Sequence, residues 1–349
     1  MPAPSVSVDL RSDTVTRPSP EMRRVIAEAE VGDMVLGDDP MVTELERYCA
    51  ELLGKERSLF FPSGIMANQT ALLVQAPPAT EAILDAEAHI LNWEDGAAAM
   101  WGGIQLRAVP AADGLLTPEQ VAAAIRPRSP FLPRTLLVCL ENTHLGGGGR
   151  VLPLAQAKAI AEVAWSHDVR VHLDGSRLPN AAVASGQPMR DFAAHADTVM
   201  IAISKGLGAP VGSLLAGTAE TMERAWRVRR RMGGGMRQAG LLAAAGLYAL
   251  QNHLPALAED HRRARTLASR AAEIPGLSAP PPETNIVMID LEDDRLAPDA
   301  VLAALARQGV WITQFGPRRL RAVTHRDVDD AGIDRASAAL AEAVETLAG

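Results

Sequence analysis

Lysine side chains are scarce in this chain, so a reaction that needs a lysine amine has few candidate residues. Of its 34 basic residues, only Lys55, Lys158 and Lys205 are lysines, and the rest are arginines. Lys55 lies in a polar turn after a helical segment, and Lys158 lies on a helical stretch. Both are expected to be solvated surface side chains whose stems cover apolar surface.

Lys205 has a different setting, in the segment A-I-S-K-G-L-G-A-P-V-G at the end of an apolar run. Ligands bind at the carboxyl ends of strands in parallel sheets. Partial burial there favours a neutral, nucleophilic amine, and the neighbouring glycines leave room for a planar group. A purely structural role for Lys205 stays equally open on local sequence alone.

Asp174, in V-H-L-D-G-S-R, ends the strand expected before that of Lys205. An Asp-Gly pair after a strand commonly forms only a turn. A carboxylate and a lysine at nearby strand ends also suit pyridoxal phosphate. The acid keeps the pyridine nitrogen protonated, so that the ring accepts electrons. Arg177, three residues later, is placed to face an anionic group.

A candidate anion site precedes an apolar helix at P-S-G (62–64). The backbone N–H groups after Ser63 and Gly64 would point at a bound anion, although serine-glycine caps are common. The glycine run at 146–149 lacks the lysine of a Walker loop and is interpreted as a flexible loop. No GxGxxG follows the first strand, which disfavours a nucleotide or nicotinamide enzyme.

The elements that must position these residues alternate short apolar runs with longer helical periods. This pattern predicts an α/β fold with a mostly parallel central sheet wrapped by helices. The clearest strands are 134–142, 169–174, 197–204 and 212–218, and a helix is expected over about 153–167. The stretch from about Gly240 to Arg270 is strongly helical, and Thr117 begins a capping box.

A proline cluster at 280–282 is typical of a linker, and a strand, a helix, a short β segment and an amphipathic helix follow it. We therefore expect an N-terminal arm (1–15), a large cofactor-binding α/β domain (16–252) and a small C-terminal α+β domain (253–349).

Composition limits the compartment and the partners. Hydrophobic residues make up 48% of the chain and the formal net charge is −8. These values disfavour intrinsic disorder and a nucleic-acid surface, and no stretch is long and apolar enough to span a bilayer. Cys49 and Cys139 form no disulfide framework or zinc spacing, and the N-terminus lacks the features of a signal peptide. A cytoplasmic protein without a metal ion is expected.

Taken together, the motifs resemble those of the low-specificity L-threonine aldolases, which have the aspartate-aminotransferase-like (type I) pyridoxal phosphate fold. The resemblance extends over nearly the whole chain. Its ordered matches are D-L-R-S-D-T-V-T (9–16), G-D-D-P (37–40), F-P-S-G-x-x-A-N (61–68), E-N-T-H (141–144), H-L-D-G-S-R (172–177), S-K-G-L-G-A-P-V-G (204–212), G-G-G-M-R-Q (233–238) and V-T-H (323–325).

This resemblance implies a role for each candidate residue. Lys205 resembles the Schiff-base lysine and Asp174 the partner of the pyridine nitrogen. His89, which alone would be a satisfied core or surface histidine, resembles the histidine that stacks on the cofactor ring. Ser63 and Gly64 resemble part of the phosphate cradle.

Arginines complete the implied site. Arg237 resembles a phosphate-binding arginine supplied by a neighbouring subunit, which implies a homodimer with shared sites, and the family suggests a tetramer. Ser12, Arg177 and Arg321 resemble the clamp that holds the substrate carboxylate, and Arg177 also belongs to the cofactor-binding set. Arginine suits this role because its planar fork matches a carboxylate.

The implied reaction is retro-aldol cleavage of L-threonine, L-allo-threonine and related amino acids to glycine and an aldehyde. His89, directly or through a water, would remove the β-hydroxyl proton. Three departures from the family pattern fall where the substrate side chain would lie: Leu36 instead of tyrosine, Pro130-Phe131 where some members have a histidine, and N-W-E-D-G-A-A (92–98). They leave β-elimination or transamination on the same fold open, and a scaffold that has lost catalysis is a further alternative.

Overall fold

The computed structural model describes residues 8–348, so the first seven residues of the expected arm, and Gly349, lie outside the described residues. By contacts between residues the chain divides into two compact units. The large unit comprises Pro18–Ser204 and Ala209–Leu254. The small unit comprises 8–17, Lys205–Gly208 and the chain from Pro255 onward.

A seven-stranded sheet forms the centre of the large unit. Its order is β2 (Arg57–Phe61), β8 (Ser213–Gly217), β7 (Thr198–Ala202), β6 (Arg170–Gly175), β5 (Thr135–Glu141), β3 (Glu81–Asp85) and β4 (Gln105–Val109). Only β8 runs antiparallel to its neighbours. β3, β7 and β8 are buried along their whole length, as strands covered on both faces should be. The predicted mostly parallel sheet and its four clearest strands are confirmed.

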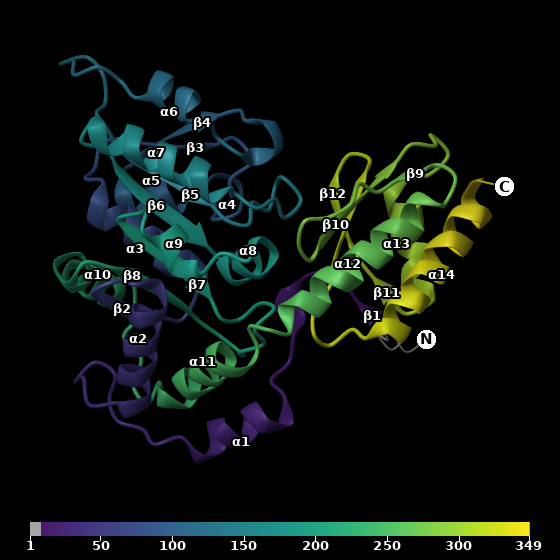
Figure 1. Ribbon diagram of the computed structural model, residues 1–349, viewed down its shortest axis with the longest axis horizontal. Helices are drawn as coiled ribbons and strands as arrows, with labels where there is room; N and C mark the ends of the chain where they lie inside the picture. The colour runs from purple at the N-terminus through teal and green to yellow at the C-terminus, as the bar shows by residue number, and fades with distance from the viewer. Residues whose placement is uncertain (1–7, 349) are drawn as a thin grey trace. The chain divides into compact units, whose positions relative to one another are not determined.

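Helices pack around this sheet, as Figure 1 shows. Apolar side chains of β2 and β8 pack against α3 and α10, and those of β3 and β5 pack against α3, α4 and α5. No helix within residues 8–348 is long and apolar enough to cross a membrane. The helices of this unit are α1 (Pro20–Glu28), α2 (Pro40–Leu53), α3 (Gly64–Gln75), α4 (His89–Asn92), α5 (Ala97–Gly102), η2 (Ala112–Gly114), α6 (Pro118–Ala124), α7 (Leu154–Ser166), α8 (Leu178–Ser185), α9 (Met189–Ala193), α10 (Ala219–Arg231) and α11 (Gly240–Asn252).

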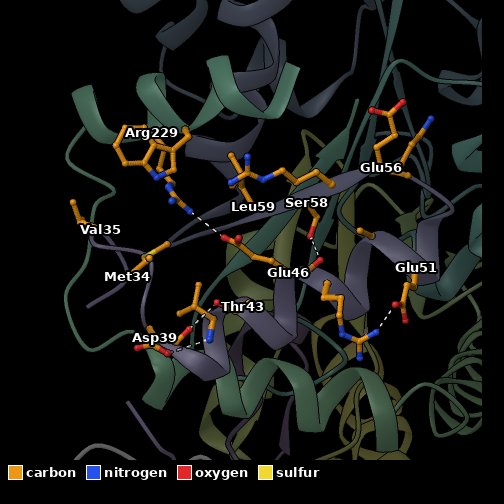
Figure 2. Close-up of a pocket in the computed structure, with 17 residues that line it drawn as sticks. Met34, Val35, Asp39, Thr43, Glu46, Glu51, Glu56, Ser58, Leu59 and Arg229 are labelled. Carbon is orange, nitrogen blue, oxygen red and sulfur yellow. Dashed lines mark hydrogen bonds and ion pairs between the residues drawn. The ribbon is translucent and has the colours of Figure 1, made fainter. Parts of the chain in front are cut away.

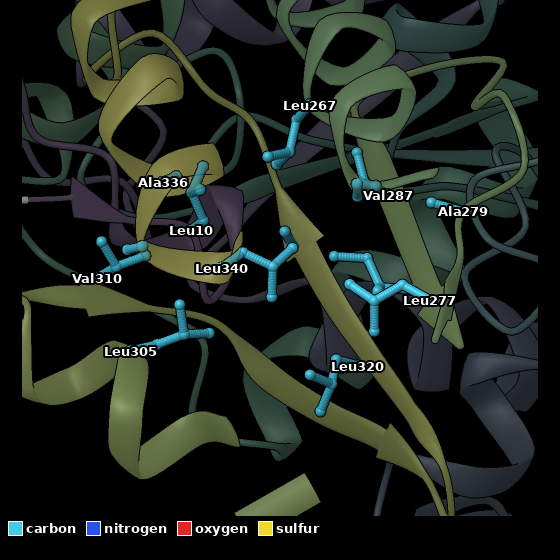
Figure 3. Close-up of a cluster of buried hydrophobic side chains, with 14 of the residues drawn as sticks. Leu10, Leu267, Leu277, Ala279, Val287, Leu305, Val310, Leu320, Ala336 and Leu340 are labelled. Carbon is cyan, nitrogen blue, oxygen red and sulfur yellow. The ribbon is translucent and has the colours of Figure 1, made fainter. Parts of the chain in front are cut away.

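The small unit is an α+β layer built on a four-stranded antiparallel sheet. The sheet order is β12 (Thr313–Gly316), β13 (Arg319–Val323), β10 (Ile286–Leu291) and β9 (Leu277–Ser278). β1 (Val8–Asp9) pairs in parallel with β11 (Val310–Trp311), and η1 (Asp13–Val15) follows it. The side chains of α12 (Leu257–Ala272), α13 (Pro298–Arg307) and α14 (Asp330–Ala348) fill one apolar core with those of the strands (Figure 3).

Two sequence expectations need correction in detail. The helical stretch from Gly240 to Arg270 is two helices, because the chain between Asn252 and Leu257 turns at Pro255, which disfavours a helical conformation in the residue before it. The segment just before the proline cluster at 280–282 forms β9, which pairs with the end of β10. Antiparallel pairing with an existing strand overrides the weak strand propensity of Leu277 and Ser278.

One carboxylate joins the N-termini of two helices in the large unit. Asp39, which is 1% exposed, accepts hydrogen bonds from Val42 N (3.1 Å) in α2 and Gly240 N (2.8 Å) in α11. An anion here satisfies two N–H groups that lack partners within their own helices and complements both helix dipoles. Thr117 makes the predicted capping box with Gln120, but it caps a single helix.

We therefore predict that Asp39→Ala lowers the free energy of unfolding of the cofactor-free protein by about 3 kcal/mol, since one cap and one buried acceptor are lost together. Thr117→Ala, the matched control, is expected to cost about 1 kcal/mol. Urea unfolding followed by circular dichroism measures both. A loss for Asp39→Ala no larger than that for Thr117→Ala would contradict the shared-cap interpretation.

Candidate active site

Asp174 lies on the central strand β6 and is 1% exposed. Its Oδ2 accepts a hydrogen bond from Asn68 Nδ2 (2.8 Å), and its Oδ1 accepts one from Ser176 N (3.0 Å). Both oxygens of this buried carboxylate therefore have a donor. The structure thus provides a fixed acceptor at the carboxyl end of a parallel strand, where the sequence predicted it.

Ser63 and Gly64 begin helix α3, as predicted. The Ser63 hydroxyl accepts from Met66 N (3.2 Å), and the first backbone hydrogen bond of the helix runs from Ala67 N to Ser63 O. The N–H groups of the first turn precede that bond, which is the arrangement that binds anions. Asn68 lies one turn further along α3, so the same helix reaches Asp174.

His89 is the first residue of α4, and its backbone N donates to Glu141 Oε2 (2.8 Å) at the end of β5. Its ring Nδ1 lies 3.0 Å from Glu94 Oε1. His89, Glu94 and Asp174 have ligand-type atoms within 4.8 Å of one another. Two predicted site residues, His89 and Asp174, therefore converge, and a second carboxylate, that of Glu94, joins them.

A polar network continues behind Asn68. Asn68 Oδ1 lies 3.1 Å from His172 Nε2, and His172 Nδ1 lies 2.9 Å from Thr198 Oγ1. Gln75 Nε2 donates to the same hydroxyl at 2.7 Å. Burial lowers the pKa of His172 to about 4, so this ring is neutral near pH 7.

Three predicted residues belong to the small unit, gathered around the segment after β1. Thr16 Oγ1 donates to the backbone carbonyl of Lys205 (2.8 Å), which also accepts from Gly208 N (2.8 Å). Ser12 is the N-cap of η1 and accepts from Thr14 N. Arg321 Nη2 donates to the carbonyl of Arg11 (3.3 Å), next to Ser12.

Stacking also steadies Arg321, whose guanidinium lies 4.9 Å from the centre of the Phe315 ring. In the large unit, Arg177 is 5% exposed and precedes α8. Arg237 differs from it, because its side chain is 67% exposed and donates to Asp33 Oδ2 (3.1 Å). This exposed arginine is the one for which the sequence implied a role in a neighbouring subunit.

The other two lysines have structural settings. Lys158 is exposed, as expected, and pairs loosely with Glu162 (3.9 Å). Lys55 is not the solvated lysine that was expected, because its Nζ donates to the Ala196 carbonyl at 2.6 Å. Burial lowers the pKa of Lys55, and the contact ties the end of α2 to the turn before β7.

The cavity that is drawn in Figure 2 has a volume of about 470 Å³ and holds none of the predicted site residues. It lies over α2, β2 and α10, and its wall includes Glu46 and Arg229. Arg229 donates to Phe60 O (2.5 Å) and to Glu46 Oε1 (3.4 Å), so both charges serve the packing of β2.

Sequence reasoning missed Glu94, Asn68 and His172. Asn68 and His172 were present in matched motifs, but no role was assigned to them. Glu94 was treated only as part of the departing segment 92–98. Its position five residues after His89 was the available signal. The other departures, Leu36 (77% exposed) and Phe131 (91% exposed), lie on the surface of the large unit.

The sequence of this chain is similar to those of known proteins over most of its length. A sequence model of the family described as beta-eliminating lyase matches residues 9–294. Low-specificity L-threonine aldolase 1 of Arabidopsis thaliana is 40% identical over 98% of this chain and 97% of its own length. The low specificity L-threonine aldolase of Escherichia coli K12 is 42% identical over 92% of this chain and 94% of its own.

A solved structure shares the fold. The threonine aldolase of Leishmania major superposes with a TM-score of 0.84 at 20% identity, covering 97% of this chain and 99% of the other. Identity of about 40% over nearly the full length of both chains is the stronger result. The chain therefore belongs to the beta-eliminating lyase family, in the branch that contains the low-specificity L-threonine aldolases.

Proposed function

We propose that this protein is a pyridoxal-phosphate-dependent lyase that cleaves L-threonine, L-allo-threonine and related L-β-hydroxy-α-amino acids to glycine and an aldehyde. The observation that carries the proposal is the buried Asp174 carboxylate, held by Asn68 and Ser176 at the end of β6. Such a group suits a protonated pyridine nitrogen. The names of the relatives at 40–42% identity supply the substrate class.

The described residues fit pyridoxal phosphate in two respects. Asp174 suits its ring nitrogen, and the first turn of α3 after Ser63 and Gly64 suits its phosphate. Lys205 is proposed as the covalent attachment point, with His89 against the ring and Arg177 at a polar ring substituent. When bound, the cofactor supplies an electron sink for the bond that breaks.

The chain's own side chains would bind and orient the substrate. Ser12, Arg177 and Arg321 are proposed to hold its carboxylate, which fixes the direction of the Cα–Cβ bond. The contact of Arg321 with Phe315 restrains the guanidinium before substrate arrives. His89 is proposed to take the proton of the β-hydroxyl group, directly or through a water.

We further propose a homo-oligomer with shared sites, at least a dimer and in the family pattern a tetramer. Arg237 supports this because its side chain is 67% exposed and free to serve a neighbouring subunit's phosphate site after leaving Asp33. Large apolar side chains on the surface of the large unit, including Leu36, Met100 and Trp101, are also suited to subunit contact. A reducing cytosol is proposed as the location, since Cys49 and Cys139 are buried free thiols.

Aldehyde release is the direct test. Cofactor-loaded protein given L-threonine, L-allo-threonine or L-phenylserine should form aldehyde and glycine in equal amounts. Lys205→Ala should lower the rate about a thousandfold or more, because the attachment point is lost. Lys158→Ala is the matched control, an exposed lysine whose loss should leave the rate unchanged.

A second function has specific support, because the matching family is described as beta-eliminating lyase. Formation of pyruvate or ammonia without aldehyde would favour elimination, and amino transfer to a keto acid would favour a transaminase. Either product pattern from the loaded enzyme would overturn the aldolase assignment.

If each active site is shared between two subunits, two inactive variants should complement each other. Lys205→Ala and Arg237→Ala chains should each be inactive alone. When they are co-expressed with different tags, each mixed dimer regains one intact site, so the pooled protein should show about a quarter of wild-type activity. A mixture that stays inactive, although tandem purification confirms mixed oligomers, would place Arg237 and Lys205 in one subunit's site or remove Arg237 from it.

A further inference from the structure

Glu94 contacts three neighbouring polar side chains through its carboxylate. Its side chain is fully buried. Its Oε1 accepts from Asn68 Nδ2 (2.8 Å) and faces His89 Nδ1 (3.0 Å), while its Oε2 accepts from Gln69 Nε2 (2.6 Å). Both oxygens of this carboxylate therefore act as hydrogen-bond acceptors for amide N–H groups.

The hydrogen-bond directions in this network follow from Asn68. Its Nδ2 faces two carboxylate oxygens, so its Oδ1 is the acceptor for His172 Nε2. Because the His172 ring is neutral and carries its hydrogen on Nε2, its Nδ1 accepts from the Thr198 hydroxyl, to which Gln75 Nε2 donates.

Asn68 then has two hydrogens for two acceptors. One bond goes to Glu94 Oε1 and the other to Asp174 Oδ2, both at 2.8 Å. The amide separates two buried carboxylates that would otherwise repel each other, and fixes the distance between them. His89 meets the same Glu94 oxygen, so the network reaches the proposed catalytic histidine.

Because both oxygens of Glu94 accept hydrogen bonds from amides, Oε1 is also an acceptor toward the His89 ring, and this decides which ring nitrogen carries the hydrogen. The atom that faces Glu94 Oε1 is Nδ1, so Nδ1 carries the hydrogen. In the neutral ring Nε2 is then left as the basic atom. A side chain rotated to expose Nδ1 would lose this charge-assisted bond.

We infer that Glu94 is a positioning residue that holds His89 with its hydrogen on Nδ1, so that Nε2 is the atom that takes the proton of the substrate hydroxyl. The inference rests on the proposed function for the role of His89 in the reaction. The state of the ring itself is a property of the protein without cofactor and is measured separately.

The decisive readout is the ¹⁵N spectrum of histidine-labelled, cofactor-free protein above pH 8, with the His89 signals among eight histidines assigned by His89→Asn. Wild-type protein should show hydrogen on Nδ1 and a lone pair on Nε2. Glu94→Ala should lose this preference. Its kcat should fall about a hundredfold while KM changes less than about threefold, as when a base is misplaced.

Two variants separate positioning from stability. Glu94→Gln keeps a carbonyl toward His89, and its new N–H can meet Gln69 after that amide rotates, since Gln69 Oε1 has no hydrogen-bond partner among the described residues. It should retain the Nδ1 hydrogen and restore part of kcat. Glu81→Ala removes another fully buried glutamate, bonded to Arg126 at the opposite end of the sheet, and should lose stability with an unchanged His89 spectrum.

Wild-type protein with the hydrogen on Nε2 of His89 overturns the inference without any variant, as does a Glu94→Ala protein that keeps both the Nδ1 hydrogen and kcat. A wild-type ring in the inferred state, in an enzyme that releases no aldehyde from any substrate, would instead refute the proposed function and leave the positioning by Glu94 intact.

Discussion

The large unit depends on one amide, that of Asn68, which lies between two buried carboxylates. Asp174 and Glu94 each accept one of its hydrogens at 2.8 Å. Without the amide, two carboxylates would lie close together in a region of low dielectric with no donor between them. With it, both carboxylates accept a hydrogen bond. One can serve a cofactor nitrogen and the other a histidine.

The local structure follows from this requirement. His172 and Asp174 are two residues apart on β6, so their side chains point to the same face of the sheet. Helix α3 packs against β6 and β7 and presents Asn68 to both side chains. His172 orients the amide, and Asp174 uses that orientation. An acidic residue one position earlier or later on β6 would point to the opposite face of the sheet, where it could not accept a hydrogen bond from Asn68.

Sequence reasoning recovered what depends on local pattern. Apolar runs predicted β5 to β8, and chemistry at strand ends pointed to Asp174. It failed where partners are distant in the chain. Asn68 and Asp174 are 106 residues apart, so no local pattern shows their bond. Lys55 was misjudged for the same reason, because its acceptor, Ala196 O, is 141 residues away. Glu94 was overlooked because it was interpreted only as part of the atypical segment 92–98.

Attachment of the cofactor tests the central claim most directly. The protein can be loaded with pyridoxal phosphate, reduced with borohydride and digested, and the modified peptide can be identified by mass spectrometry. Because the chain has only three lysines, each outcome is distinct. The account predicts a single stable label on Lys205 that Asp174→Ala weakens. A label on Lys55 or Lys158, or no label at saturating cofactor, would contradict it.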